Sequence, residues 1–257
     1  MLESEVSGLI KAEVITINPE GVAEAEVELV PAEQELTFVM NNRHEARFSC
    51  APHRVRSLVA GWLAGEGVVS APSDVISLEI DMKTQRVDIT LTPQCLDQLE
   101  QRLASEKGLL AGDSPFERRT DTSLELEPEI VDKLAENFRK LFLSLKSAER
   151  MCYLCCIASP QEILTYGEGF HRINAMYRAI GELALNGQST LNKVALVNFG
   201  LSRSHAIRLA RTGISIAVCL APPTSAAIEV ANNYYLTIVQ AAMGSGTRVY
   251  SSPWRVI

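Results

Sequence analysis

Residues 151–181 read MCYLCCIASPQEILTYGEGFHRINAMYRAIG, and this stretch decides the fold of the C-terminal half. Two apolar runs are joined by a polar turn and followed by a segment whose apolar residues recur every three or four positions. This pattern predicts two strands and a helix, with a polar cluster from Glu168 to Asn174 between the last strand and the helix. Open α/β sheets bind ligands at such junctions, so the cluster is the first candidate site.

The rest of the C-terminal half alternates strands with helices. Further strands are expected over 194–199, 214–220, 236–239 and 248–251, and helices over 173–185, 204–210 and 225–232. Because strands that alternate with helices favour parallel pairing, the pattern predicts an α/β domain over residues 128–257. Its sheet is expected to be parallel or mixed and covered by helices on both faces.

The N-terminal half has a different pattern. Residues 8–50 alternate at period two, which predicts four strands, with Asn41-Asn42 as a hairpin turn. A helix from about Val55, strands over 75–80 and 87–91 and a helix over 96–103 complete an α+β module, residues 1–106. The segment 107–127 is rich in glycine, charge and turn formers and predicts an inter-domain loop.

Charge is unevenly distributed along the chain. The net charge is −7, but residues 147–257 carry nine Lys/Arg against five Asp/Glu. The acidic total argues against nucleic-acid binding, and the basic second half predicts that an anionic ligand binds there, unless this is ordinary surface variation. No apolar run has the length of a membrane span, and the acidic start lacks the basic region of a secretory signal, which predicts a cytoplasmic protein.

Three strand-to-helix junctions are expected at one edge of the C-terminal sheet, over 166–174, 198–202 and 220–224. Ser202 and Thr224 are typical helix N-cap residues, and the N–H groups at helix starts bind anions. The segment Gly244 to Gly246 lets backbone amides approach a phosphate closely. These features predict an anion or nucleotide site, with ordinary capping and turn chemistry as the alternative.

The cysteines predict buried thiols more than a metal or redox site. Cys152 and Cys155 form a CxxC on an expected strand, where residues three apart point to opposite faces and do not chelate one ion. We therefore predict no metal site, although Cys152 begins the strand and faces the proposed rim. Nearby, Arg172 suits an anion and Glu168 a sugar hydroxyl or base edge, with a local surface ion pair as the alternative.

Four segments carry a resemblance to a known family. Residues 168–181, EGFHRINAMYRAIG, are similar to the signature EDVGRHNALDKLIG. Residues 221–231 resemble APTTLAVELA, residues 248–255 resemble NVYTHPER, and residues 58–76 resemble an early helix-and-turn segment. The chain thus resembles, over most of its length, the FdhD-type formate dehydrogenase accessory sulfurtransferases.

This chain departs from the family pattern at reactive positions. The family carries its sulfur on a GCGVCG loop, where Leu109 and Gly112 stand in this chain, and neither forms a persulfide. Cys152 occupies the place of the histidine in the family's TGGxHAA segment. Tyr177 replaces an aspartate of the signature, and Arg208 holds the position of a family lysine.

The resemblance implies a function and a set of site residues. Family members pass sulfur from a cysteine desulfurase to the molybdenum cofactor, bis-molybdopterin guanine dinucleotide, before it enters formate dehydrogenase. It further implies a homodimer, a cytidine-deaminase-like α/β fold for the C-terminal domain and a pocket for a GDP-like nucleotide moiety, with Cys152 as the candidate catalytic thiol. The cofactor-binding residues expected on this basis are Glu168, Arg172, Asn174, Ser202, Arg208, Thr224, Ala241, Ala242, Met243, Gly244, Ser245 and Gly246.

Three other functions stay open. Because the loop cysteines are replaced, the chain is alternatively a degenerate paralogue that binds cofactor or partner without sulfur transfer. A zinc-dependent nucleoside-type hydrolase is suggested by fold analogy alone, and the sequence has no PCxxC segment for it. A pure interaction protein, in which the junctions are only helix caps, is the third.

Overall fold

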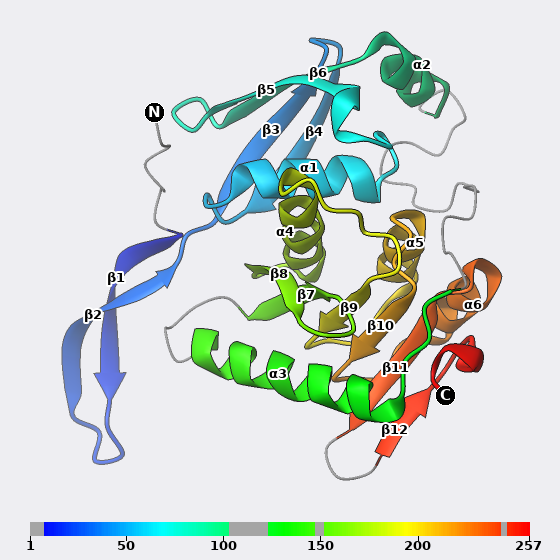
Figure 1. Cartoon of the computed structure of the whole chain (residues 1–257). Helices are drawn as coiled ribbons and strands as arrows, with labels where there is room; N and C mark the ends of the chain where they lie inside the picture. Colours follow the sequence, from blue (N-terminus) through cyan, green and yellow to red (C-terminus); the bar gives the residue numbers. More distant parts are fainter. Residues whose placement is uncertain (1–7, 103–122, 147–151, 243–245) are drawn as a thin grey trace.

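The computed structural model describes residues 8–102, 123–146, 152–242 and 246–257. Three sheets organise these residues: a two-stranded hairpin, a four-stranded sheet and a six-stranded sheet (Figure 1). The four-stranded sheet belongs to the N-terminal module and the six-stranded sheet to the C-terminal module. A mixed α/β architecture with an α+β first part, as the sequence predicts, is confirmed.

The N-terminal module is built on strands in the order β4-β3-β6-β5. Its elements are β3 (Gln34–Met40), β4 (His44–Cys50), α1 (Val55–Gly65), η1 (Pro72–Asp74), β5 (Val75–Asp81), β6 (Arg86–Leu91) and α2 (Pro93–Arg102). Asn41 and Asn42 both have positive φ and turn β3 back into β4, which confirms the predicted hairpin. One face of the sheet packs on α1 through an aromatic core in which Phe38 and Phe48 contact Trp62.

The C-terminal module has a mixed sheet in the order β12-β11-β10-β9-β7-β8. Its elements are α3 (Pro128–Lys146), β7 (Tyr153–Ala158), β8 (Ile163–Gly169), α4 (Arg172–Leu185), β9 (Val194–Val197), α5 (Arg203–Arg211), β10 (Ile216–Cys219), α6 (Ser225–Tyr234), β11 (Thr237–Ala242), β12 (Gly246–Val249) and η3 (Pro253–Arg255). The sheet is mixed because β9, β10 and β11 are parallel, whereas β7 and β12 run antiparallel to their neighbours.

Both faces of this sheet are buried. Along β7, Cys155 and Ile157 join the core with α4, α5 and α6, and Leu154 and Cys156 join the core with α3. Consecutive strand residues point to opposite faces, so a strand that is apolar at every position needs helices on both sides. The predicted covering of both faces is confirmed. The proposed likeness to the cytidine-deaminase fold stays a prediction.

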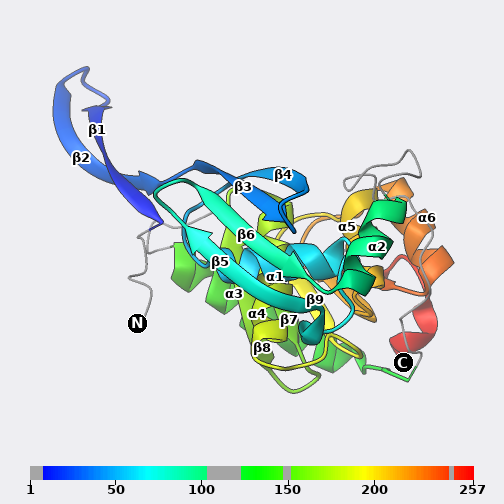
Figure 2. The ribbon, with the colours of Figure 1, turned by 90° about the horizontal axis from the view of Figure 1, so that it is seen from above.

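The two modules share a seam formed by two helices. Figure 1 shows the layers in order: α3, the six-stranded sheet, α4 and α5, then α1 and the four-stranded sheet. Seen from above in Figure 2, β5 and β6 lie over α1. Helix α1 is therefore packed on both sides, against its own sheet and against α4.

The hairpin of β1 (Leu9–Ile17) and β2 (Ala23–Pro31) projects away from both modules in Figures 1 and 2. Its strands pair in register, with Glu13 opposite Val27 and Ile15 opposite Ala25. Large apolar side chains on it, among them Ile15, Ile17 and Val27, are exposed. The hairpin thus offers apolar surface outside the body of the protein.

Residues 123–127, which were predicted to belong to the inter-domain loop, pair with the C-terminal end of the chain. The Leu126 N–H donates to Arg255 O at 2.8 Å, and the Ile257 N–H donates to Leu126 O at 3.1 Å. Because the two paired segments are far apart in the chain, the sequence of neither segment shows a periodic pattern that predicts the pairing. The rest of the expected loop, residues 107–122, lies outside the described residues.

Candidate functional site

The predicted junctions meet at one edge of the six-stranded sheet. Strands β8, β9, β10 and β11 point the same way, so their carboxyl ends lie together, next to the start of β7. Helices α4, α5 and α6 begin just after β8, β9 and β10. We call this edge the rim, defined by Cys152, Gly169, Asn198, Leu220 and Gly246. Its three helix starts give it partial positive charge.

Cys152 is exposed at the rim beside β9. The side chain of Asn198 fixes the entry to β7: its Nδ2 donates to Cys152 O at 2.9 Å, and its Oδ1 accepts from the Leu154 N–H at 2.9 Å. All six cysteines are among the described residues, and the other five are buried. Cys152 is therefore the thiol of this chain that a partner protein reaches without unfolding it.

Arg172 lies at the same rim, at the first position of α4. Its guanidinium carbon is 5.1 Å from the ring centroid of Tyr153 and 5.9 Å from that of Phe199, and the two rings meet edge to face at 5.7 Å. A cation at a helix N-terminus is opposed by the helix dipole, and the aromatic faces offset this. The exposed guanidinium consequently suits an anionic or stacking ligand.

Ser202 and Thr224 are N-caps, as the sequence predicts. The Thr224 hydroxyl accepts from the Ala227 N–H at 3.2 Å at the start of α6. At α5, the Ser202 N–H donates to Nδ1 of His205 at 3.1 Å, and the Ser202 hydroxyl lies 3.0 Å from the same atom. Nδ1 is therefore an acceptor. Burial, then the charges of Arg208 and Arg172, lower the pKa of His205 from 6.5 to about 4, so the ring is neutral at pH 7.

The neutral His205 predicts a pH-dependent stability. The unfolded chain binds this proton below pH 6.5, whereas the folded chain binds it only near pH 4, so stability is complete above pH 6.5 and falls as the pH is lowered through this window. The expected loss is about 3 kcal/mol in total. Urea unfolding between pH 4.5 and 7.5 measures it, and His205→Gln should flatten this part of the profile. Parallel profiles for the two proteins would contradict the assignment.

Glu168 and Asn174 are buried against the N-terminal module instead of being exposed at the rim. The Glu168 Oε1 lies 3.7 Å from Nε2 of His53, in the loop before α1. The Asn174 amide donates to Ser49 O, at the end of β4, at 2.8 Å. Both residues therefore join the modules, and their expected contact with a cofactor stays a prediction.

Arg208 likewise lies in the seam, and its assignment as a cofactor residue stays a prediction. Its Nε and Nη2 approach Glu66 Oε1 at 2.7 and 2.6 Å, and its Nε also donates to the Tyr177 hydroxyl at 2.6 Å. The Tyr177 hydroxyl donates to Glu66 as well, and burial, then Glu66, raise the pKa of Tyr177 well above its usual range. Glu66 thus gathers partners from α4 and α5 in a fully buried position.

Glu66 and Arg178 are important residues that sequence reasoning missed. Arg178 is fully buried, and its two terminal nitrogens donate to Glu168 O and Ala51 O, each at 2.8 Å. Burial lowers the pKa of Arg178 to about 10. The signal in the sequence that could have found Glu66 and Arg178 is a charged residue among apolar residues that recur at helical spacing. Such residues are buried when they find partners.

Comparison with known proteins identifies a family. A family model described as the FdhD/NarQ family matches residues 31–257. The chain belongs to the FdhD/NarQ family. This confirms the resemblance read from residues 168–181, 221–231 and 248–255.

Several FdhD/NarQ relatives are similar over nearly their whole length. The "Sulfur carrier protein FdhD" of Bacillus subtilis (strain 168) is 23% identical over 230 residues, which cover 86% of this chain and 87% of that protein. The protein of the same name from Listeria monocytogenes serotype 4b (strain F2365) is 24% identical over 243 residues, 88% of this chain and 91% of that protein. A crystal structure of a putative formate dehydrogenase accessory protein from Desulfotalea psychrophila matches with a TM-score of 0.75 at 18% identity, over 97% of this chain and 99% of that one.

The signature of this FdhD/NarQ chain lies on the helix that crosses α1. A Cβ added at Gly181 would lie 1.8 Å from Ser57 O, and one at Gly61 would lie 1.8 Å from Tyr177 O. Backbone therefore meets backbone where α1 and α4 cross. The terminal glycine of the signature serves this close approach.

Gly181→Ala is expected to lower the free energy of unfolding by at least about 2 kcal/mol, because the added methyl group separates the two helices. Without this contact the substitution would favour the helix by about 1 kcal/mol. Gly65→Ala is the matched comparison, since its Cβ would meet the Tyr177 ring at 2.8 Å and no backbone atom so closely. Urea unfolding should rank Gly181→Ala below Gly65→Ala, and the reverse order would refute the close crossing.

Other predicted positions are only partly described. Leu109 and Gly112 lie outside the described residues, as do Met243, Gly244 and Ser245. Ala241 is buried in β11, and its carbonyl accepts a hydrogen bond from Arg139 at 2.8 Å. Ala242 is the last residue of that strand, and Gly246 is the first residue of β12, with φ +81°.

In the described ranges, no cluster of His, Cys, Asp and Glu has the make-up of a metal site. None of the helices described has the length and apolar character of a membrane span.

Proposed function

We propose that this protein is a sulfur carrier in the maturation of a formate dehydrogenase, moving sulfur from a cysteine desulfurase to the molybdenum cofactor in the cytoplasm. Membership of the FdhD/NarQ family and the names of its relatives support this proposal. The observation that carries it is the position of Cys152, an exposed thiol at the rim among five buried ones. Cys152 takes the role that loop cysteines have in the family pattern.

The proposed transfer is an exchange between two thiols. The Cys152 thiolate attacks the outer sulfur of a persulfide on the desulfurase, a new S–S bond forms, and the donor cysteine leaves as a thiolate. No oxidant is needed, because the transferred sulfur keeps its oxidation state. The proton of Cys152 is released to solvent, which its exposure permits.

The rim suits the nucleotide end of the proposed cargo. Arg172 supplies a cation over two aromatic rings, and the starts of α5 and α6 direct backbone N–H groups to the same edge. A guanine dinucleotide presents phosphates and a flat base, the two groups that such a surface attracts. We also propose that the mixed sheet with helices on both faces is a cytidine-deaminase-like fold.

Mass spectrometry tests the sulfur-carrier proposal directly. The purified chain is incubated with a cysteine desulfurase and cysteine, digested without reductant and searched for a gain of about 32 mass units per sulfur. The proposal expects this gain on the peptide that contains Cys152. Its absence from every cysteine would overturn sulfur transfer and leave a binding role.

Arg172→Ala should weaken the binding of GDP at the rim by about tenfold or more, since one charge-assisted contact is lost. Isothermal titration at constant salt measures this change. Arg248→Ala is the control, because Arg248 is exposed on β12 and has no aromatic platform among the described contacts. Equal affinities for wild type and Arg172→Ala would remove Arg172 from the site.

A paralogue that binds cofactor or partner without sulfur transfer is the second candidate. It is favoured by Leu109 and Gly112, which stand where the family pattern has its cysteines.

We also propose a homodimer, which the exposed apolar hairpin β1–β2 supports, because a two-stranded ribbon is only marginally stable alone. Sedimentation velocity on the full chain distinguishes a dimer from a monomer.

A further inference from the structure

Aliphatic side chains form the inner wall of a cavity in the seam. Ala60 and Ala64 lie four residues apart on one face of α1, and Ala184 lines the same space from α4. Leu63 and Ile180 are buried beside them. No aromatic side chain is among the described residues that line the cavity. The three alanines leave the space, and its wall offers aliphatic carbon.

The cavity lies at the far end of α4 from the rim. It has a volume of about 580 Å³ and is bounded by α1, β5, the end of α4 and the residues that follow it. Helix α4 has 14 residues, so its two ends are about 20 Å apart. The cavity is therefore separate from the rim, and its volume lies in the range of ligand pockets.

The polar side chains beside this wall have partners within the protein. The Thr212 hydroxyl donates to Leu209 O at 2.9 Å, and the Thr190 hydroxyl donates to Thr212 O. The Ser189 hydroxyl accepts from the Leu191 N–H at 3.1 Å. These three side chains do not depend on a ligand for their hydrogen bonds.

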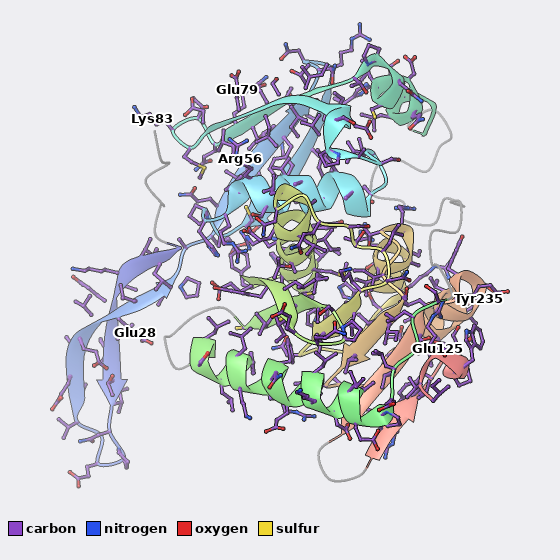
Figure 3. All side chains as sticks on the ribbon, in the orientation of Figure 1. Glu28, Arg56, Glu79, Lys83, Glu125 and Tyr235 are labelled. Atoms are coloured by element: carbon purple, nitrogen blue, oxygen red, sulfur yellow. The ribbon has the colours of Figure 1, made fainter. Side chains whose placement is uncertain are left out.

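The charge at the cavity is also engaged. Arg56 is the only charged residue among the described residues that line the cavity, and its Nη1 donates to Leu78 O in β5 at 3.4 Å. Arg56 has a further interaction within the protein, and Figure 3 shows it between α1 and β5. A charged ligand would therefore lose hydration without gaining a counter-ion, whereas an uncharged ligand would not bear this cost.

Two large aliphatic residues are exposed at the opening of the cavity. Ile76 is 63% exposed on β5, where the pairing with β6 shifts register between Val75 and Ser77. Leu185 is 48% exposed at the end of α4. Exposed apolar surface around a hollow marks a binding site, and a ligand that reaches the opening would cover both residues.

We propose that the seam cavity binds an uncharged aliphatic molecule, either a chain or a saturated ring system, with at most a hydroxyl group at the opening. Binding is driven by apolar burial against Ala60, Ala64 and Ala184. The volume is roughly four times that of a dry cavity that binds benzene. A chain of about ten carbons fits within it. This site is independent of sulfur transfer and of the rim.

The uncharged fluorescent probe N-phenyl-1-naphthylamine tests the proposal on the full chain, with decanol and decanoate as competitors at neutral pH. A single probe molecule should bind per chain. Decanol should displace it about tenfold more effectively than decanoate, because the carboxylate finds no counter-ion. Ala184→Phe fills the interior and should weaken probe binding by about tenfold.

The hairpin β1–β2 and helix α3 supply the controls, since both also offer exposed apolar side chains. Ile15→Lys and Leu143→Lys should leave probe binding unchanged. Thermal unfolding confirms that each variant is folded. Ala60→Leu, on the half-buried face of α1, replaces Ala184→Phe if that variant is unfolded.

Three results with the probe would overturn the proposal: unchanged binding in a folded filling variant, loss of binding in either lysine variant, or stronger displacement by decanoate than by decanol. Binding that weakens as the protein concentration rises would overturn it as well, because a second copy of the chain would then cover the opening.

Discussion

Glu66→Gln is expected to lower the free energy of unfolding by about 3–5 kcal/mol, the largest stability effect we expect from one substitution. Glu66 is fully buried and receives Arg208 through two nitrogens, at 2.6 and 2.7 Å. Arg211 lies nearby, with its Nη1 3.9 Å from Glu66 Oε2 and 3.1 Å from Gly65 O. Glutamine keeps the shape but removes the charge, so two buried guanidinium groups lose their carboxylate.

Urea unfolding at pH 7 measures this loss, and two variants calibrate it. Glu79→Gln removes an exposed carboxylate of the same module, visible at the surface in Figure 3, and should change stability by less than about 0.5 kcal/mol. Tyr177→Phe removes one hydrogen bond to a charged group and should cost about 2 kcal/mol. If Glu66→Gln behaved like Glu79→Gln, the buried ion pair would not hold the modules together.

Local pattern was enough to predict most helices and strands of this chain. Strand β6 and helix α4 are within a residue of the expected bounds, since strands and amphipathic helices have distinct periods. The hairpin at Asn41-Asn42 was also predicted, because few residues adopt positive φ there. The rim follows from the same reasoning, since parallel strands place their carboxyl ends on one edge.

The seam could not be predicted in this way. Asn174 bonds to Ser49, Arg178 to Ala51 and Arg208 to Glu66, and each pair is more than 120 residues apart in the chain. Sequence reasoning placed such polar residues at a ligand site, because it contains no signal for partners so distant. The polar positions of the signature make contacts across the two modules that no local pattern predicts.

Helix α4 consequently connects the rim with the seam. Its first residue, Arg172, lies over the rim aromatics, and its middle carries Tyr177 and Gly181 in the seam.

Cys152→Ser is expected to abolish the maturation of formate dehydrogenase, the largest functional effect we expect. In a host that lacks its own accessory protein, wild type should restore formate dehydrogenase activity and Cys152→Ser should restore less than about 1% of it. Serine differs from cysteine by one atom but forms no persulfide, so the substitution removes the carrier chemistry and little else. Because Cys152 is exposed, the substitution should leave the fold intact, and a loss of activity would reflect the lost thiol.

Cys95→Ser is the matched control, because Cys95 is a buried thiol on α2, in the other module. Burial raises the pKa of Cys95, which makes it a poor nucleophile, and its replacement should leave maturation intact. Full activity with Cys152→Ser would exclude sulfur transfer through this thiol and would favour the paralogue that binds without transferring sulfur. Loss of activity together with loss of the persulfide would place the carrier at the rim, because the other five thiols are closed to solvent.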